Sequence, residues 1–139
     1  MKKRWLLILI LFLVGCSKGP TKELVCNQEL GEFNFSLMMK FDNIKIKDIN
    51  FECTSDISKY NEIQVKAINE KDFCSIVKET MKGYENSFID CKQDISNNHL
   101  LISSKLDINL ITNKRIKKIG DIEDGKKVLE NEGYTCMIK

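Results

Sequence analysis

Residues 32–41, EFNFSLMMKF, decide the fold, because apolar and polar side chains alternate along them, with Met38 as the one apolar residue on the polar face. Successive side chains of a β-strand point to opposite faces, so this alternation predicts a half-buried strand of about ten residues. The apolar face holds Phe33, Phe35, Leu37, Met39 and Phe41. Other elements of the chain must therefore cover one face of this strand.

A second strand is expected directly after a short turn. Asp42-Asn43 favours a tight turn, because Asp and Asn tolerate the left-handed backbone that hairpins use. Residues 44–53 then return as a strand. The apolar positions of that strand are Ile44, Ile46, Ile49, Phe51 and Cys53. The one-residue change of phase within this set predicts a β-bulge near Asp48.

The remaining segments add further strands and two helices. Asn69 resembles an N-cap, and apolar residues at helical spacing predict one long helix over residues 69–85. Residues 54–64 are polar and favour no element. The other expected strands cover residues 24–28, 88–95, 99–110 and 134–138, with Asn97-Asn98 as a turn. A basic connector at 113–118 leads to a short helix that Asp121 caps and that Gly133 ends after Glu132.

This order of elements predicts an α+β fold. We expect an antiparallel sheet of about five to six strands, with the long helix and the short C-terminal helix packed on one face. An open six-stranded sheet is favoured over a closed barrel, since one face has only the helices to cover it. Residues 22–139 are expected to form a single domain.

The first sixteen residues, MKKRWLLILILFLVGC, have the pattern of an export signal. Three basic residues precede ten apolar ones, which is about half the length that a membrane-spanning helix needs. The ending Leu13-Val14-Gly15-Cys16 resembles a bacterial lipobox. That resemblance implies a signal peptide at 1–15, cleavage before Cys16, diacylglycerol on the Cys16 thiol and a fatty acyl group such as palmitate on the new amino terminus. Residues 16–21 are then a tether, and the lipid anchor holds the chain on the extracytoplasmic face of the cell membrane.

Removal of the leader changes the charge of the chain. The whole sequence has 22 basic and 20 acidic residues, but three of the basic residues lie in the leader. The remaining 124 residues have a net charge of about −1, whereas a nucleic-acid-binding domain shows a basic surplus. We therefore expect no nucleic-acid partner.

Five cysteines remain after Cys16, so at least one stays unpaired within the chain. The favoured disulfide is Cys26–Cys136, because both residues lie in strand-like segments at the two ends of the domain. Cys74 and Cys91 form a second candidate pair, which leaves Cys53 buried. The alternative, that Cys53, Cys74 and Cys91 are all small core residues, stays open. The absence of a C-x-x-C motif argues against a redox pair and a zinc site.

A family resemblance emerges from the lipobox, the hairpin around Asp42-Asn43 and the ending Gly125–Cys136, GKKVLENEGYTC. Together they resemble small Gram-positive lipoproteins related to the YehR-like family. The resemblance implies an exported, lipid-anchored α+β domain. It implies no established activity and assigns no catalytic residue.

Four other groups of residues have a functional and a simpler interpretation. His99 with a cysteine would make a nucleophile–base pair, but a surface turn is favoured. Asp42, Asp48 and Glu52 would bind a hard cation if they converged, but a solvated hairpin is favoured. Anionic headgroups or wall polymers would suit the basic residues of the connector, and a solvated loop is the simpler interpretation. In the functional interpretation, Phe33, Phe35 and Phe41 line an apolar pocket. In the simpler interpretation, they are ordinary core residues. The basic residues of the connector are Lys114, Arg115, Lys117 and Lys118.

The leading functional hypothesis is a lipid-anchored, non-catalytic lipoprotein that binds a partner or supports an envelope complex, with no cofactor. The membrane is its one defined partner, through Cys16. A carrier of a small ligand between sheet and helix is the alternative, and a cysteine-dependent envelope enzyme is a third hypothesis that needs a reactive Cys53, Cys74 or Cys91.

Overall fold

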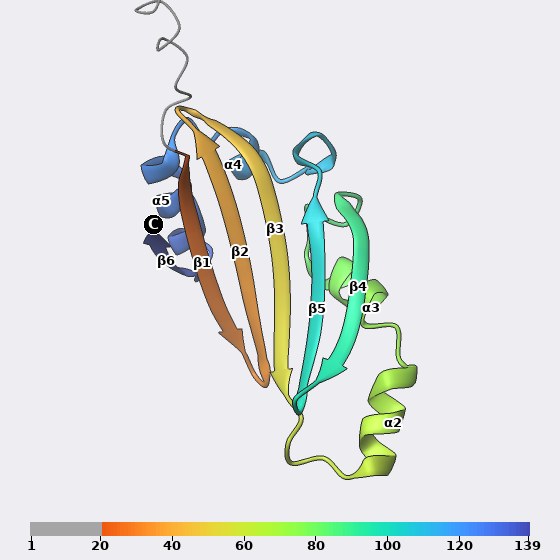
Figure 1. The fold of residues 1–139 in the computed structure, drawn as a ribbon. Coiled ribbons are helices and arrows are strands. Elements are labelled where there is room, and N and C mark those ends of the chain that lie inside the picture. Colours follow the sequence, from red (N-terminus) through yellow and green to blue (C-terminus); the bar gives the residue numbers. More distant parts are fainter. Residues whose placement is uncertain (1–20) are drawn as a thin grey trace, which may run out of the picture.

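The computed structural model describes residues 21–139, which form a six-stranded antiparallel sheet with helices (Figure 1). The strands are β1 (Lys22–Leu30), β2 (Phe33–Asp42), β3 (Lys45–Asp56), β4 (Phe88–Ser96), β5 (His99–Leu106) and β6 (Thr135–Ile138). The helices are α2 (Glu62–Glu70), α3 (Phe73–Thr80), the 3-10 turn η1 (Ile108–Leu110), α4 (Lys114–Lys117) and α5 (Ile122–Asn131). The strand order is β4-β5-β3-β2-β1-β6, so the predicted α+β class and open sheet are confirmed.

The hairpin of β2 and β3 forms the centre of the sheet. Asn43 has a φ of 56°, as expected for a residue of the tight turn between the two strands. Lys40 pairs with Asp48 while Phe41 pairs with Ile46, so Lys47 is the extra residue of a bulge. The bulge therefore lies next to the predicted position, and it brings both apolar phases of β3 to the same face.

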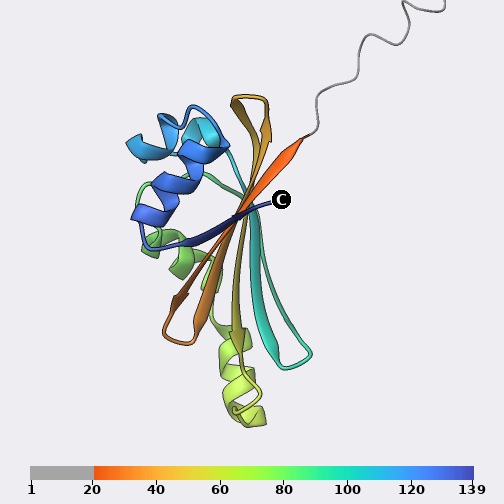
Figure 2. The ribbon, with the colours of Figure 1, turned by 90° about the vertical axis from the view of Figure 1, so that its left-hand side faces the viewer.

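The core lies on one face of the sheet. In Figure 2, α3, α4 and α5 all lie on the same side of the strands. The fully buried strand residues on this face include Leu24, Leu37, Met39, Ile49, Phe51 and Ile102. The opposite face carries polar residues such as Ser36, Glu52 and Ser103, which lie side by side across β2, β3 and β5. This division is the half-buried pattern that the alternation in β2 predicts.

Two disulfide bonds link distant parts of the chain. Cys26 in β1 bonds to Cys136 in β6, and Cys74 in α3 bonds to Cys91 in β4. These are the two pairs that the sequence favours, and they exclude the alternative in which Cys74 and Cys91 are reduced core residues. Cys53 is the free cysteine of the described residues and is buried. Disulfides persist in oxidising compartments, which agrees with an extracytoplasmic location.

The single long helix predicted over residues 69–85 is wrong. The structure has two shorter helices instead, α2 over Glu62–Glu70 and α3 over Phe73–Thr80. The first begins at Asn61, whose side chain and that of Gln64 form a reciprocal capping box. The second begins at Asp72, which accepts a hydrogen bond from the Ser75 N–H. Asn69 therefore lies inside a helix and not at its start.

The C-terminal part follows the prediction apart from one strand boundary and the predicted connector at 113–118, which contains the short helix α4. β5 ends at Leu106, and the η1 turn occupies residues that the alternation assigned to the strand, because Asp107 caps that turn by accepting from the Asn109 N–H. Asp121 caps α5, and Gly133 follows it with a φ of 97°. Within residues 21–139, none of the helices has the length and apolar character needed to cross a membrane.

A candidate binding site beside helix α2

Helix α2 stands at the end of the sheet farthest from the β2–β3 turn (Figure 1). The helix has no buried residue, although it carries Ile63, Val65 and Ile68. Ile63 is 81% exposed, whereas Val65 and Ile68 are partly buried against the core. Most helices of a folded domain fully bury an apolar stripe, whereas α2 buries its stripe only in part and leaves apolar surface beside it accessible.

The first cleft lies between α2 and the start of β2 and has a volume of about 370 Å³. We call it the aromatic cleft. Its lining residues include Phe33, Ile57, Ile68, Lys71, Phe73 and Leu100. The rings of Phe33 and Phe73 have centroids 6.4 Å apart, so they form a tilted aromatic pair at the cleft. The volume falls within the range of small-molecule sites.

A tyrosine and a glutamate stand at the edge of the aromatic cleft. The Tyr60 hydroxyl donates a hydrogen bond of 2.7 Å to the Glu32 carboxylate. This bond raises the pKa of the Tyr60 hydroxyl above its usual value, because it stabilises the neutral phenol beside an anion. Together with Lys71, the pair provides a charged border around an apolar interior. That combination suits a ligand with an apolar body and a polar end.

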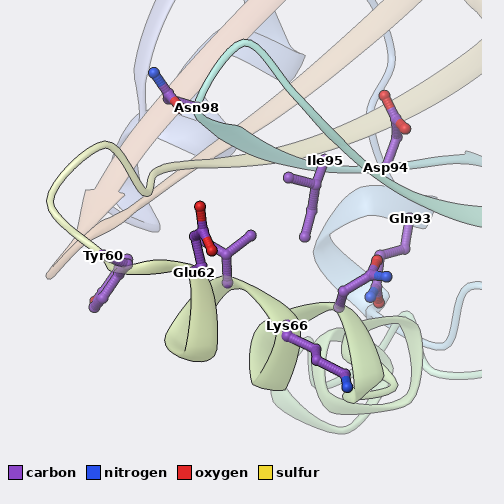
Figure 3. A pocket seen from close by; sticks show the side chains of 9 residues that line it. Tyr60, Glu62, Lys66, Gln93, Asp94, Ile95 and Asn98 are labelled. Atoms are coloured by element: carbon purple, nitrogen blue, oxygen red, sulfur yellow. The ribbon is translucent and has the colours of Figure 1, made fainter.

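A second cleft of about 640 Å³ lies on the other side of α2 (Figure 3), and we call it the amide cleft. Its lining residues include Tyr60, Lys66, Asn69, Gln93, Ile95 and Asn98. Figure 3 shows Ile95 pointing from β4 toward α2. Polar side chains dominate this lining, so it is the less suitable of the two clefts for an apolar group.

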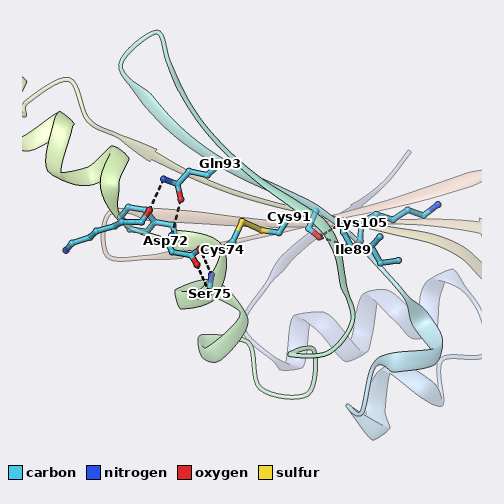
Figure 4. The surroundings of a disulfide bond; sticks show 10 residues. Asp72, Cys74, Ser75, Ile89, Cys91, Gln93 and Lys105 are labelled. Atoms are coloured by element: carbon cyan, nitrogen blue, oxygen red, sulfur yellow. Dashed lines mark hydrogen bonds between the residues drawn. A yellow bond between two sulfur atoms is a disulfide. The ribbon is translucent and has the colours of Figure 1, made fainter.

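The junction between α2 and α3 is fixed to β4 (Figure 4). The Phe73 N–H donates to the Gln93 side-chain oxygen at 3.0 Å, and the Gln93 side-chain nitrogen donates to the Lys71 carbonyl at 2.9 Å. One residue further on, Cys74 is bonded to Cys91. On the other side of α2, the Ile57 N–H donates to the Asn98 carbonyl four residues before the N-cap Asn61. Tyr60, directly before that cap, is held by its hydrogen bond to Glu32. Both ends of the helix are therefore held while its two sides stay open.

The structure does not bring His99 and a cysteine into a catalytic pair. His99 is exposed, and its Nδ1 lies 2.8 Å from the Asn97 carbonyl in the turn before β5. Cys74 and Cys91 are bonded to each other, and Cys53 is fully buried. A reactive thiol, on which the cysteine-enzyme hypothesis depends, is therefore missing from residues 21–139.

The other predicted candidates lie at separate places in the fold. Lysines engage two of the three carboxylates: Lys47 contacts Asp42 at 2.8 Å, and Lys105 contacts Asp48 at 2.7 Å. No group of three metal-binding side chains occurs in the described part of the chain. Phe35 and Phe41 belong to the core, and Phe33 is the residue of that stripe that lines the aromatic cleft. The basic residues Lys114, Arg115, Lys117 and Lys118 are all exposed around α4. Cys16 lies outside the described residues.

Sequence reasoning missed the residues that α2 brings to the clefts. Residues 54–64 are mostly polar and their few apolar residues follow no clear period, so Tyr60 was given no role. The signal that would have located the helix is the pair Asn61 and Gln64, whose spacing fits a capping box. Comparisons with protein families, curated proteins and solved structures found no match for the chain. The YehR-like resemblance therefore stays a prediction, and the function has to be inferred from the chemistry of the clefts.

Burial of Cys53 predicts a loss of stability at alkaline pH. Burial raises the pKa of this thiol from 9.0 to about 11, because the thiolate would lie in an apolar core. The unfolded chain therefore releases this proton at lower pH than the folded one. The contribution of the protonated Cys53 thiol to the free energy of unfolding is fully present below pH 9 and is lost as the pH rises toward 11.

Urea unfolding at a series of pH values measures this effect. A difference of two pKa units corresponds to about 2–3 kcal/mol. Between pH 8 and pH 11, the free energy of unfolding of the wild type should therefore fall by about that much more than that of Cys53→Ala. The comparison uses the change in unfolding free energy with pH. The stability that the smaller side chain loses at every pH therefore cancels. Parallel slopes for the two proteins would contradict a buried thiol at this position.

Proposed function

We propose that this chain is a lipid-anchored, non-catalytic binding protein of the cell envelope, and that the aromatic cleft is its binding site. One observation carries the proposal: α2 is held at both ends but fully buries none of its residues, and an apolar cleft lies beside it. Anchoring through Cys16 rests on the lipobox in the sequence, and the two disulfides support export. Cys74 and Cys91 are bonded to each other and Cys53 is buried, which supports a function without cysteine catalysis.

A carrier of a small ligand is the second candidate function, and the volume of the aromatic cleft favours it. Its site is then this open cleft at the end of the sheet, and not an enclosed cavity behind the strands. A carrier should retain ligand during purification. Mass spectrometry of the protein, sprayed first intact and then after denaturation, distinguishes a bound small molecule from an empty cleft that binds a partner protein.

Filling the aromatic cleft tests the binding site. Ala67 lies on α2, lines the cleft and is exposed, so Ala67→Trp introduces a large ring without removing core packing. The probe is anilinonaphthalene sulfonate, whose fluorescence rises in apolar sites and whose sulfonate suits Lys71. We expect Ala67→Trp to weaken probe binding by at least about tenfold.

Ile63→Trp is the matched control for this experiment. Ile63 lies on the same helix, is 81% exposed and is not among the residues lining either cleft. We expect it to change the dissociation constant of the probe by no more than about twofold. Equal weakening by both variants, or by neither, would contradict the assignment of the site.

The anchor is tested independently of the cleft. Cys16→Ala should abolish fatty-acid labelling of the chain in cells, because it removes the thiol that would accept diacylglycerol. The variant should also be found uncleaved or released from the membrane fraction. Undiminished labelling would show that the lipid is attached elsewhere or that the leader is a different kind of signal.

A further inference from the structure

The two ends of the sheet differ in what they carry. Lys22, the first residue of β1, pairs with Phe41 beside the β2–β3 turn, so the chain enters the domain at the end opposite α2. Figures 1 and 2 both show the β2–β3 turn as the outermost point of this end, with α4 near it. We call it the anchor end, and the end with α2 the distal end.

An apolar side chain projects from the anchor end. Ile44 occupies the β2–β3 turn and is 67% exposed, between the exposed residues Asn43 and Lys45. Leu110, in η1, is also half exposed, and the basic residues of α4 follow it in the chain. An exposed isoleucine among lysines is the composition that favours the boundary between lipid headgroups and acyl chains.

The two ends of the sheet also differ in charge. At the distal end, residues 29–32, 56–72 and 94–99 carry seven carboxylates and three lysines. At the anchor end, residues 22–23, 40–48, 82–90 and 105–124 carry ten basic and nine acidic side chains. Asp42 and Asp48 of that set form ion pairs with Lys47 and Lys105, so the charges within each pair cancel. The anchor end is therefore close to neutral and the distal end is negative, so an anionic surface repels the distal end more strongly than the anchor end.

The length of chain before β1 restricts how far this end stands from a bilayer. Cys16 and Lys22 are six positions apart, a distance of at most about 22 Å when the chain is fully extended. The twelve residues of β3 span about 40 Å between the two ends of the sheet. With Cys16 in lipid, the anchor end is thus within reach of the bilayer surface, and the distal end extends away from it.

We propose that the anchor end docks on an anionic lipid bilayer, with Ile44 inserted among the headgroups and the lysines of the turn and of α4 facing lipid phosphates. This docking rests on the lipid anchor of the proposed function. It orients the chain so that the aromatic cleft faces away from the membrane. The lipid surface thus acts as a second binding partner, recognised by the folded domain and not only by the acylated Cys16.

Two single-cysteine labels test the docking in the mature acylated chain. Ile44→Cys and Ile63→Cys place a nitrobenzoxadiazole dye on exposed isoleucines at opposite ends, while Cys53 is buried and the other described cysteines are bonded. The chains are inserted into phosphatidylcholine vesicles with or without phosphatidylglycerol. Nitroxides on the lipid acyl chains then quench any dye that reaches the bilayer.

We expect strong quenching at position 44 and little at position 63 when phosphatidylglycerol is present, and a smaller contrast without it. Lys117→Glu with Lys118→Glu should reduce quenching at position 44 toward the level in phosphatidylcholine alone. Equal quenching at both positions of an acylated chain overturns the docking and leaves the anchor intact. The mass of the same sample reports acylation, and a chain without lipid overturns the anchor and the docking that depends on it.

Discussion

Replacing both Cys26 and Cys136 by alanine is expected to lower the free energy of unfolding by about 5 kcal/mol. The bond joins residues separated by 110 positions, so it restricts nearly the whole domain in the unfolded state. It also fixes the edge strand β6 to β1, where the two cysteines face each other in register. Urea unfolding of the oxidised wild type and of the double variant measures the difference.

The second disulfide provides the control. Cys74 and Cys91 are separated by only 17 positions, so the same double replacement by alanine should cost about 3 kcal/mol. Both comparisons remove two sulfur atoms, which leaves loop length as the main difference between them. A larger loss from the Cys74–Cys91 pair than from Cys26–Cys136 would contradict this explanation.

Phe51→Ala is expected to destabilise the domain by about 3–5 kcal/mol, because it empties the centre of the core. Phe51 is fully buried in β3, between β2 and β5. Its ring lies 6.1 Å from that of Phe35 and 5.4 Å from that of Phe88, measured between centroids. The substitution therefore removes aromatic contacts with strands on both sides.

Ile63→Ala is the matched control for the core substitution, because Ile63 is 81% exposed on α2. Its effect on the unfolding free energy should stay within about 0.5 kcal/mol. Both values come from urea unfolding at neutral pH. Similar losses for the two variants would mean that the buried face of β3 contributes less than its packing implies.

The sheet could be predicted because its sequence pattern is local. Alternation in residues 32–41 identifies the buried face of β2, and Asp42-Asn43 identifies the turn that sets the register with β3. The phase shift after Ile46 likewise indicates a bulge without any knowledge of the partner strand. Asp121 and Gly133 mark the two limits of α5 for the same reason, since caps depend on a few neighbouring residues.

The candidate site could not be predicted, because it depends on tertiary placement. Phe33 and Phe73 are 40 positions apart in the chain, and only the packing of α3 on the sheet brings their rings together. The periodicity of residues 69–85 is compatible with one helix, and the break at Lys71 becomes necessary only when Gln93 binds the junction. Cysteine pairing had the same uncertainty, since spacing alone does not show which strands are neighbours.

Ligand binding in the aromatic cleft is the central claim, and methyl chemical shifts in the mature chain measure it most directly. On addition of anilinonaphthalene sulfonate, the methyl signals of Ile57, Ile68 and Leu100 should move together and saturate, because these residues line the cleft. The signal of Ile44, at the anchor end, should stay in place. Shifts that miss the cleft residues, or that spread evenly over the exposed methyl groups, would contradict a binding site beside α2.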